Sequence, residues 1–488
     1  MKILLLNPPY FPRYSRPQRS PAVTKSGTLY YPIWLAYATG ALEQAGHECL
    51  LIDAPAAGFI LSDVEQKVLQ FKPNLIVIDT STPSIYEDVK TADRLHMISP
   101  LSYIVLVGTH ATALPDETFD LGSGFNAIAR KEYDETLCDL ARHIELGNFK
   151  FSEINGLSFK TKEGKIHHNP DRMFIKNLDS LPFVSAIYKK HLNTGDYFNP
   201  NALYPNITIL AGRGCPFGCN FCLYPQTMTG RKYRYRSIQN IVDEMVYIEE
   251  TFPDAKAVFF EDDTLTSDKE RLIELCRSIR ERGIKISWTA NSRAELDRET
   301  MIYIAKSGCR LLCVGFESAG QNLLDSAKKG IKPVQMYEFM KSAKKAGLLI
   351  HGCFMVGFPG ETKETLRATL ELAKRLNPDT VQFYPMMVYP GTEAYKIYKE
   401  SGFLTSEYYT DWLTSEGLHN CVVKLPDFNP EDLVSFCDRA RREFYLRPGY
   451  LWYKLIQSMM HPNEFKRNLK AFKTFRRFLW KGSDSNKK

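Results

Sequence analysis

The sequence predicts an α/β protein that joins an N-terminal doubly wound parallel sheet, a partial (βα)6 TIM-type barrel and a helical C-terminal extension. In two separate parts of the chain, short apolar runs alternate with amphipathic stretches. One irregular stretch separates these two parts. Continuous apolar runs indicate strands buried on both faces, as in parallel sheets covered by helices. The length of 488 residues also exceeds that of one compact domain.

The first segment, residues 1–145, contains five short apolar runs. They cover residues 2–7, 49–53, 74–79, 103–108 and 125–129. Helical stretches are expected between them, near residues 33–45, 62–71, 84–97 and 133–145. Such units predict a doubly wound domain, whose ligands bind beyond the carboxyl ends of the strands. Residues 146–205 break the pattern, and we expect a connector there with a hairpin around Glu163-Gly164.

The alternation returns over residues 206–400. Strands are expected at 207–212, 256–261, 285–291, 310–316, 349–357 and 379–385, each followed by a helical stretch. Six such units are two short of a closed eightfold barrel, so we expect an open one with its active site at the carboxyl ends of the strands. Residues 401–488 are expected to be mostly helical.

The composition is typical of a soluble globular protein, with 44% hydrophobic and 24% charged residues. No apolar run approaches the roughly 18 residues that span a bilayer. The opening MKILLLNPPY predicts a buried strand that ends in a turn rather than a secretory signal, so a cytoplasmic location is expected. The net charge of +7 is small against 63 basic residues. Because no stripe interleaves aromatic and basic residues, a nucleic-acid partner is not expected.

Three of the eleven cysteines lie within eight residues. Cys215, Cys219 and Cys222 follow a C-x3-C-x2-C spacing, directly after the first expected barrel strand. Thiolates are the usual ligands of iron–sulfur clusters, and the nearby glycines allow the backbone to wrap closely around one. With no fourth ligand nearby, one iron would stay open, as in reactive metal sites. The other eight cysteines are expected to be reduced core thiols.

Two other interpretations of the three cysteines remain. They could be core thiols that cluster by chance. They could also form a structural zinc site with a distant fourth ligand, although paired C-x2-C knuckles are usual there. The glycines and the position at a strand end favour the iron–sulfur cluster.

The motif CPFGCNFC resembles that of the radical SAM superfamily, and the resemblance extends over residues 206–400. It implies a [4Fe–4S] cluster on Cys215, Cys219 and Cys222, which cleaves S-adenosylmethionine (SAM) reductively, and a flavodoxin- or ferredoxin-type electron donor. The residues that the resemblance assigns to SAM lie at the motif and at successive strand ends. They are Phe221, Asp262, Asp263, Asn291, Arg293, Glu317, Gly357 and Pro359.

Each of these SAM positions also has an ordinary structural explanation. Asp262 or Asp263 could cap the following helix. Glu317 could be a buried, hydrogen-bonded carboxylate. The stretch from Gly357 to Gly360 could be a tight turn.

The first segment resembles the cobalamin (B12)-binding domain that precedes the barrel in one large radical SAM class. The resemblance implies a cobalamin site at Asp53, Gly108, His110, Ala111 and Thr112. The chain departs from that class at Thr109, which replaces a Gly-Pro pair, and at Arg130-Lys131-Glu132, where a Gly-Glu is usual. It also has no D-x-H-x-x-G motif, so His110 could be an ordinary loop histidine. A domain that only shapes the substrate pocket is the alternative to cobalamin binding.

The end of the chain combines apolar and basic residues at helical spacing. Phe465, Leu469, Phe472, Phe475 and Leu479 share one stripe, with seven basic residues between positions 466 and 481. A basic amphipathic helix suits peripheral contact with an anionic membrane surface, here the inner membrane face. Packing on the barrel with a solvated basic face explains the pattern equally well.

The resemblance implies that SAM cleavage yields a 5′-deoxyadenosyl radical, which activates an unreactive C–H bond for methylation or ring rearrangement. Residues 222–237 are similar to the radical SAM branch associated with hopanoid biosynthesis, which favours a small-molecule or lipid substrate. They resemble the anaerobic magnesium-protoporphyrin ester cyclase less closely. A non-enzymatic protein with a structural cluster is the third hypothesis. The catalytic residues cannot be assigned from the sequence.

Overall fold

A computed structural model describes residues 1–161 and 163–460. The first sheet has seven strands in the order β2-β1-β3-β4-β5-β6-β7. Its five parallel strands are β1 (Lys2–Asn7), β2 (Glu48–Asp53), β3 (Leu75–Thr80), β4 (Tyr103–Gly108) and β5 (Ala127–Ala129). The antiparallel hairpin β6 (Leu157–Lys160) and β7 (Ile166–His168) extends the sheet at one edge. The order of the parallel strands reverses between β1 and β3, so this is a doubly wound sheet.

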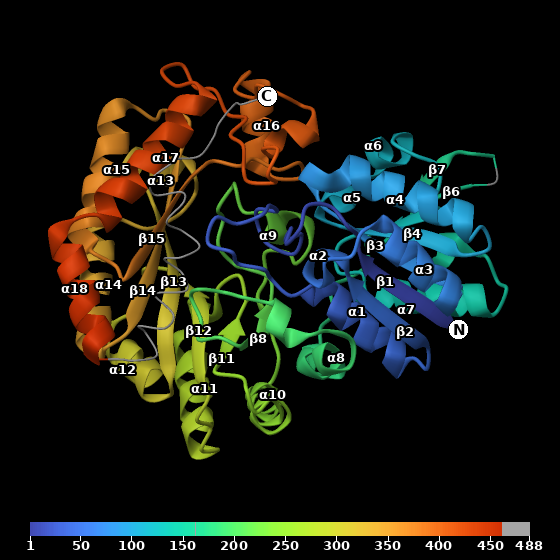
Figure 1. The fold of residues 1–488 in the computed structure, drawn as a ribbon, viewed down its shortest axis with the longest axis horizontal. Helices are drawn as coiled ribbons and strands as arrows, with labels where there is room; N and C mark the ends of the chain where they lie inside the picture. Colours follow the sequence, from blue (N-terminus) through green and yellow to red (C-terminus); the bar gives the residue numbers. More distant parts are fainter. Residues whose placement is uncertain (162, 461–488) are drawn as a thin grey trace.

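Helices cover both faces of this sheet (Figure 1). The longer ones are α1 (Ile33–Gln44), α3 (Leu61–Phe71), α4 (Ile85–Ile98) and α7 (Asp134–Glu145), and the short ones are α2 (Ala54–Ala57), α5 (Thr109–Ala113) and α6 (Pro115–Asp120). Alternate residues of β1 enter two separate cores, Ile3 and Leu5 with α1 and α7, and Leu4 and Leu6 with α3 and α4. Because successive strand side chains point to opposite faces, the apolar run of β1 serves both cores.

The second large sheet has six parallel strands in the order β15-β14-β13-β12-β11-β8. They are β8 (Asn206–Ile209), β11 (Ala257–Phe260), β12 (Ser287–Ser292), β13 (Cys309–Glu317), β14 (Leu349–Val356) and β15 (Thr380–Pro385). The helices that follow them are α10 (Ile238–Thr251), α11 (Lys269–Glu281), α12 (Arg298–Lys306), α13 (Gln321–Ser326), α14 (Pro333–Ala346), α15 (Lys363–Leu376) and α16 (Glu393–Glu400). Sequential parallel strands with helices outside form the expected partial barrel.

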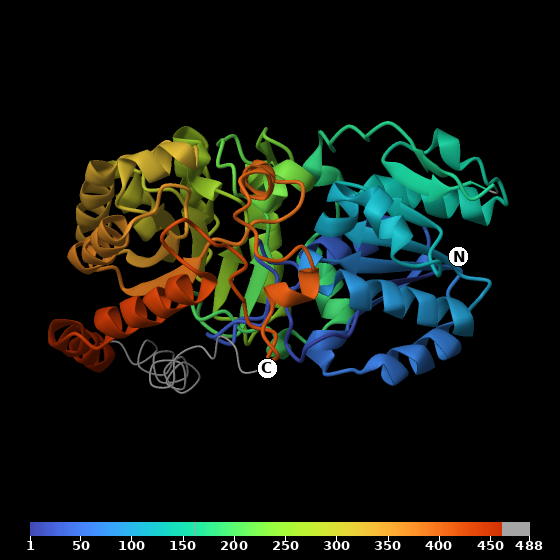
Figure 2. The same cartoon turned by 90° about the horizontal axis from the view of Figure 1, so that it is seen from above.

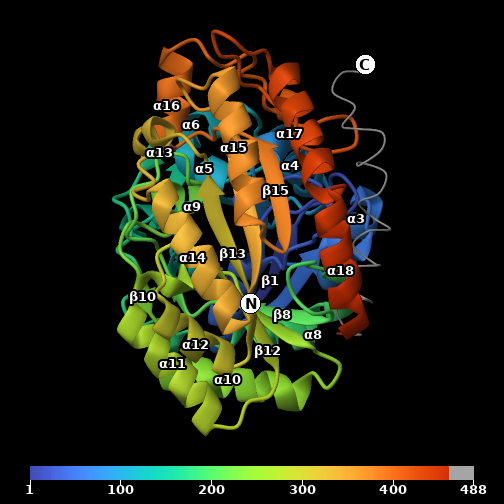
Figure 3. The ribbon, with the colours of Figure 1, turned by 90° about the vertical axis from the view of Figure 1, so that its left-hand side faces the viewer.

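The remaining strands and helices belong to neither of the two large sheets. They are α8 (Val184–His191), the two-stranded ribbon of β9 (Gly212–Arg213) and β10 (Arg234–Tyr235), α9 (Leu223–Thr227), α17 (Pro430–Tyr445) and α18 (Pro448–Met460). Short 3₁₀ turns cover Thr82–Ser84, Phe151–Glu153, Leu178–Ser180, Thr194–Asp196, Leu265–Ser267 and Tyr409–Trp412. Helix α17 packs on β15, and α18 continues beside it (Figure 3).

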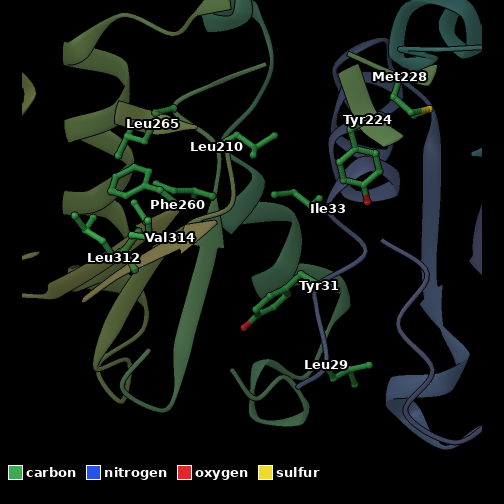
Figure 4. Close-up of a cluster of buried hydrophobic side chains, with 14 of the residues drawn as sticks. Leu29, Tyr31, Ile33, Leu210, Tyr224, Met228, Phe260, Leu265, Leu312 and Val314 are labelled. Atoms are coloured by element: carbon green, nitrogen blue, oxygen red, sulfur yellow. The ribbon is translucent and has the colours of Figure 1, made fainter. Parts of the chain in front are cut away.

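The two sheets lie side by side, with the irregular segment 8–32 between them (Figures 1 and 2). Their junction is part of one apolar core, in which Leu29, Tyr31 and Ile33 lie between the first sheet and the side chains of Leu210 and Phe260 in the barrel (Figure 4). No helix in residues 1–161 and 163–460 has the length and apolar character needed to cross a bilayer.

The structure confirms the α/β class and both sheets, and differs from the expected elements in three places. The hairpin from the expected connector adds two strands to the first sheet. The first barrel strand ends at Ile209, and Gly212–Arg213 pairs with Arg234–Tyr235 instead. The stretch 401–429 is largely irregular, with isolated bridges such as Leu404 to Val423. The boundaries of the expected segments stay predictions, and the predicted basic helix at 465–480 lies outside the described residues.

Candidate functional site

A cavity of about 620 Å³ reaches the carboxyl ends of the barrel strands and follows β15 from Thr380 to Pro385. Its wall includes Cys215, Cys219 and Cys222, strand-end residues of β11 to β15, segment 18–30 and parts of α17 and α18. Of the expected SAM residues, Phe221, Asp263, Asn291, Arg293 and Glu317 line the cavity. Asp262, Gly357 and Pro359 are not among its lining residues.

The loop that carries the cysteines is held by backbone contacts. Gly214 has φ +97°, and a Cβ there would lie 2.3 Å from the carbonyl oxygen of Lys232, so only glycine fits. The amide of Cys215 donates to the Gly230 oxygen at 3.1 Å. The Arg231 guanidinium donates to the oxygens of Phe217 and Cys219. These contacts hold the loop against the β9–β10 ribbon.

The thiols lie in a buried, partly cationic setting. Burial raises the pKa of Cys215 to about 11 and also raises that of Cys222. The Arg293 Nη1 donates to Cys219 Sγ at 3.8 Å. Without a metal, Cys215 and Cys222 are therefore protonated at neutral pH, and thiolates form only when an electropositive centre compensates for the burial.

The three cysteines form a donor set on the wall of one cavity, which Cys215, Cys219 and Cys222 all line. Thiolates are the usual ligands of iron–sulfur clusters, so this donor set fits such a cluster. In the part of the chain that the structure describes, no group of three His, Cys, Asp or Glu side chains is arranged to hold a single metal ion.

The three acidic residues after β11 differ in role. The Asp262 carboxylate is fully buried and accepts from the Ala211 amide at 3.0 and 3.1 Å and from the Tyr233 hydroxyl. These bonds tie β11 to the cysteine loop, so the geometry does not support Asp262 as a SAM ligand. Glu261 and Asp263 line the cavity instead.

Arg19, from the segment between the sheets, forms ion pairs with both of these acidic residues. Its Nη1 lies 2.6 Å from Glu261 Oε1, and its Nη2 lies 3.1 Å from Asp263 Oδ1. Burial nevertheless raises the pKa of Glu261 to about 7. The second oxygen of Glu261 is buried and has no hydrogen-bond partner. An unpaired buried acceptor is costly, so this position suits a ligand donor.

Glu317, at the end of β13, provides a similar acceptor. Its Oε1 accepts from the buried Lys329 Nζ at 2.7 Å, whereas Oε2 is buried without a partner. Its φ of +62° lies in the left-handed region, and such strain persists where the surroundings enforce it, often at functional sites. Asn291, one strand away, donates from Nδ2 to the Asp262 carbonyl oxygen at 3.0 Å.

The glycine-rich turn after β14 contacts the cysteine motif. Gly357 has φ +96°, and its amide donates to Glu361 Oε2 at 3.1 Å. Next to it, the Phe358 ring packs edge-on against Phe221 at a centroid distance of 6.3 Å. The contact with the cysteine motif is therefore made by Phe358, and a role for Gly357 and Pro359 in SAM binding stays a prediction.

The expected cobalamin residues lie at the carboxyl edge of the first sheet. The Asp53 carboxylate accepts from Asn7 Nδ2 and from the Tyr197 hydroxyl, both at 2.8 Å. Gly108 has φ +106°, and a Cβ would lie 2.3 Å from the Thr80 oxygen. The backbone here can turn only with glycine.

The next residues lead from this edge to the cysteine motif. His110 is fully buried, with Nδ1 3.2 Å from Thr82 Oγ1 and Nε2 without a partner. Burial lowers its pKa to about 3, so the imidazole is neutral, the form that binds metals. The buried Ala111 and the half-buried Thr112 follow, and Thr112 Oγ1 lies 4.0 Å from Met228 Sδ. Helix α5 contacts α9, which directly follows Cys222. A role for His110 in cobalamin binding stays a prediction.

Sequence reasoning missed several cavity residues. Arg19 and Lys25 come from a segment without periodicity, and Arg441 and Lys454 come from the C-terminal helices. Lys329 follows a short helix and meets Glu317 only through the fold. Of the cavity residues that were missed, Glu261 could have been identified from the sequence, because it precedes Asp262 in the same strand-end motif.

Comparison with protein families agrees with this division of the chain. Residues 209–373 match the Radical SAM superfamily, and residues 19–141 match the B12 binding domain. An uncharacterized methyltransferase of Pyrococcus horikoshii is 31% identical over 92% of this chain and 94% of its own length.

More distant relatives have named reactions. An anaerobic magnesium-protoporphyrin IX monomethyl ester cyclase of Rubrivivax gelatinosus is 25% identical over 90% of this chain and 78% of that protein. A hopanoid C-3 methylase of Methylococcus capsulatus is 24% identical over 82% and 74%. The solved structure of TsrM, a radical S-adenosylmethionine methyltransferase from Kitasatospora setae with cobalamin and a [4Fe-4S] cluster, has the same fold. It matches with a TM-score of 0.69 and 17% identity over 92% of this chain and 91% of that one.

Proposed function

Because this chain belongs to the radical SAM superfamily, in the class with a B12 binding domain, we propose that it methylates an unreactive carbon of a small molecule or lipid. The cofactors of this class are a [4Fe–4S] cluster, SAM and cobalamin. When bound, they would supply the reductive cleavage of SAM and the transfer of a methyl group. The single observation that carries the proposal is the set of three cysteines on the wall of the strand-end cavity.

The residues of the chain bind and position the reactants in this proposal. Cys215, Cys219 and Cys222 would hold the cluster, and Arg293 donates to Cys219. Glu261 and Asp263, now paired with Arg19, suit the ammonium group of SAM, because a second cation can take the place of the guanidinium. The buried walls exclude water from the reactive centre.

The first sheet supplies the cobalamin site in this proposal. Gly108 ends β4 and is followed by His110, Ala111 and Thr112, and Asp53 ends β2. Both strand ends lie at the edge where ligands of doubly wound sheets bind. The contact between α5 and α9 supports a short path from this edge to the cysteines. A flavodoxin- or ferredoxin-type donor would supply the electron.

Methylation is favoured over cyclisation because the relative with 31% identity is named a methyltransferase, whereas the cyclase is 25% identical. A non-enzymatic role fits poorly with a strained Glu317 and unpaired carboxylate oxygens in the cavity, because such costly features accompany ligand binding.

A lipid-like substrate is supported by the surface of α18. Five of its apolar side chains are at least 40% exposed: Leu451, Trp452, Leu455, Ile456 and Met459. Exposed apolar groups on one helix mark a contact surface, and the chain continues directly into the basic segment 466–481. We therefore propose that α18 faces an anionic lipid surface, which would be the inner membrane face for a cytoplasmic protein. A hopanoid-like substrate is one form of this proposal.

The test is anaerobic reconstitution with iron and sulfide, followed by reduction and addition of SAM. The wild type should form 5′-deoxyadenosine, and Cys222→Ala should lose this activity because one cluster ligand is gone. Cys276→Ala, a buried cysteine of α11 away from the cavity, is the matched control and should retain it. Wild-type protein that binds iron but never cleaves SAM would contradict the proposal.

A further inference from the structure

The loop that carries the cysteines has an outer face toward solvent. Pro216 and Gly218 are exposed, whereas the neighbouring Cys215 and Cys219 are buried. On another side the first domain covers the motif, because α9, which directly follows Cys222, contacts α5. The face around Pro216 and Gly218 is therefore a side from which a second protein can approach the cysteines.

The segment beside this face is rich in basic residues. Four of the six residues in 231–236 are Arg or Lys. Arg234 and Arg236 each pair with a glutamate inside the protein. Arg231 and Lys232 are exposed instead, and they form no ion pair with a carboxylate in the part of the chain that the structure describes. The protein therefore leaves two positive charges uncompensated at the surface.

Both of these cations lie on the cysteine loop. The Arg231 guanidinium donates to the carbonyl oxygens of Phe217 and Cys219. The backbone of Lys232 is in close contact with Gly214, since a Cβ on Gly214 would lie 2.3 Å from the Lys232 oxygen. Arg231 and Phe217 also line the cavity. The surface and the cysteine end of the cavity therefore share these two side chains.

A third cation borders the loop from the barrel. A Cβ on Gly218 would lie 3.8 Å from Lys328 Cβ. Lys328 is exposed, and its Nζ pairs with Glu393 at 2.6 Å. In Figure 3, α13, which precedes Lys328, lies on the same side of the molecule as β10, which follows Lys232. The basic surface therefore extends from the β9–β10 ribbon to the barrel.

This arrangement of charges suits a negatively charged protein surface. Complementary charges steer two proteins together and fix their orientation. The exposed Pro216 and the half-buried Phe217 give the face an apolar centre within a charged rim, as in protein interfaces. Electron transfer becomes faster as donor and acceptor come closer, so a donor gains most by docking on the loop that holds the cluster ligands.

We infer that an acidic one-electron donor protein docks on this face, which we call the donor face: Pro216, Gly218, Arg231, Lys232 and Lys328. The inference rests on the proposed function and deepens it, because it names the surface through which the partner reaches the cysteines. In the transfer, one electron leaves the donor and enters the cluster, and no bond forms or breaks.

The test measures the binding of flavodoxin, an acidic donor protein, to the reconstituted holoprotein by calorimetry. Wild-type affinity should fall about ten-fold between about 50 and about 300 mM NaCl, because salt screens exposed charges. At the lower salt, Lys232→Glu/Lys328→Glu should bind about ten-fold more weakly than the wild type. The matched control Lys341→Glu/Lys345→Glu makes the same charge change at the far end of α14 and should bind like the wild type. Arg231 is left unchanged because its guanidinium holds the loop.

Formation of 5′-deoxyadenosine separates docking from damage to the cluster. With reduced flavodoxin, Lys232→Glu/Lys328→Glu should form it about ten-fold more slowly than the wild type. With dithionite, a small reductant that needs no docking surface, both proteins should form it at the same rate. Lys232→Arg/Lys328→Arg keeps the charges and should keep the flavodoxin affinity.

Three results would overturn the donor face. They are equal flavodoxin affinity in the wild type and the double Glu variant, an equal loss of activity with both reductants, and no measurable binding of flavodoxin to the wild type. Each of them leaves dithionite-driven formation of 5′-deoxyadenosine by the wild type intact. Its absence would instead refute the proposed function.

Discussion

The carboxyl edges of the two large sheets differ in how their buried polar groups are partnered. At the barrel edge, charged groups surround a cavity of about 620 Å³, and carboxylate oxygens of Glu261 and Glu317 have no partner. At the edge of the first sheet, the charged groups Asp53, Arg16 and Asp88 all have partners, although the buried His110 Nε2 has none. Asn7 and Tyr197 both donate to Asp53, and the fully buried Arg16 and Asp88 pair at 2.5 Å.

The difference indicates how each edge recognises a ligand. The barrel edge keeps acceptors and cations available, so it is organised for small charged ligands. The edge of the first sheet has a glycine turn and a neutral imidazole within a packed surface. It is therefore organised to recognise a ligand by its shape. The segment 8–32 joins the two edges, because Arg16 pairs with Asp88 and Arg19 pairs with Glu261.

The largest expected effect concerns the edge of the first sheet, where Arg16 pairs with Asp88. Arg16→Met would leave Asp88 as an uncompensated buried charge, which should lower the free energy of unfolding by about 3–5 kcal/mol. Urea denaturation followed by circular dichroism measures this change. The double variant Arg16→Met/Asp88→Asn should recover most of the loss. Lys328→Met, which breaks an exposed pair with Glu393, should cost at most about 1 kcal/mol. Equal losses in the free energy of unfolding for Arg16→Met and Lys328→Met would contradict the expected difference between the buried and the exposed ion pair.

The next effect tests the glycine turn. Gly108→Ala should cost about 3 kcal/mol, because left-handed strain adds to the clash with the Thr80 oxygen. Gly46→Ala is the matched control, since Gly46 has φ +90° and open space around it, and it should cost about 1 kcal/mol. Protein purified with hydroxocobalamin should lose its corrinoid spectrum only in the Gly108 variant. Equal corrinoid content in both variants would mean that cobalamin binding does not need the Gly108 turn.

A smaller effect is the pH dependence that His110 contributes. Its pKa is about 3 in the folded chain and about 6.5 when unfolded. Below the unfolded pKa the unfolded state binds more protons, so stability falls as the pH falls. Between about pH 7 and pH 5 the loss should be about 2 kcal/mol. Urea midpoints at both pH values should show this loss in the wild type, and His110→Gln should reduce it. If His110→Gln lost as much stability between these pH values as the wild type, the imidazole would be accessible to protons in the folded chain.

The smallest effect concerns the surface of α18. Trp452→Ser/Ile456→Ser should weaken sedimentation with phosphatidylglycerol vesicles about three-fold, because apolar area is lost. Val334→Ser, an equally exposed apolar side chain on α14, should leave vesicle binding unchanged. Similar losses in both variants, or binding to phosphatidylcholine alone, would contradict a specific anionic lipid contact.

The sequence predicted the strands of both sheets to within about three residues, because strands buried on two faces appear as continuous apolar runs. The β6–β7 hairpin was visible locally, but its pairing with β5 depends on the fold. The distinction between Asp262 and Asp263 could not be made, because neighbouring strand residues face opposite sides and either side could be the cavity. Arg19, Lys25 and Arg441 reach the cavity from distant segments that have no motif, so only the fold brings them to the cysteines.

The central claim is that three cysteines hold a [4Fe–4S] cluster with one iron open to SAM. Iron analysis and electron paramagnetic resonance of the reduced protein test it directly. The account predicts about four iron atoms per chain and a signal that changes when SAM is added. It also predicts that the triple variant Cys215→Ala/Cys219→Ala/Cys222→Ala loses both the iron and the signal. Iron retained by the triple variant, or a wild-type signal that SAM leaves unchanged, would contradict it.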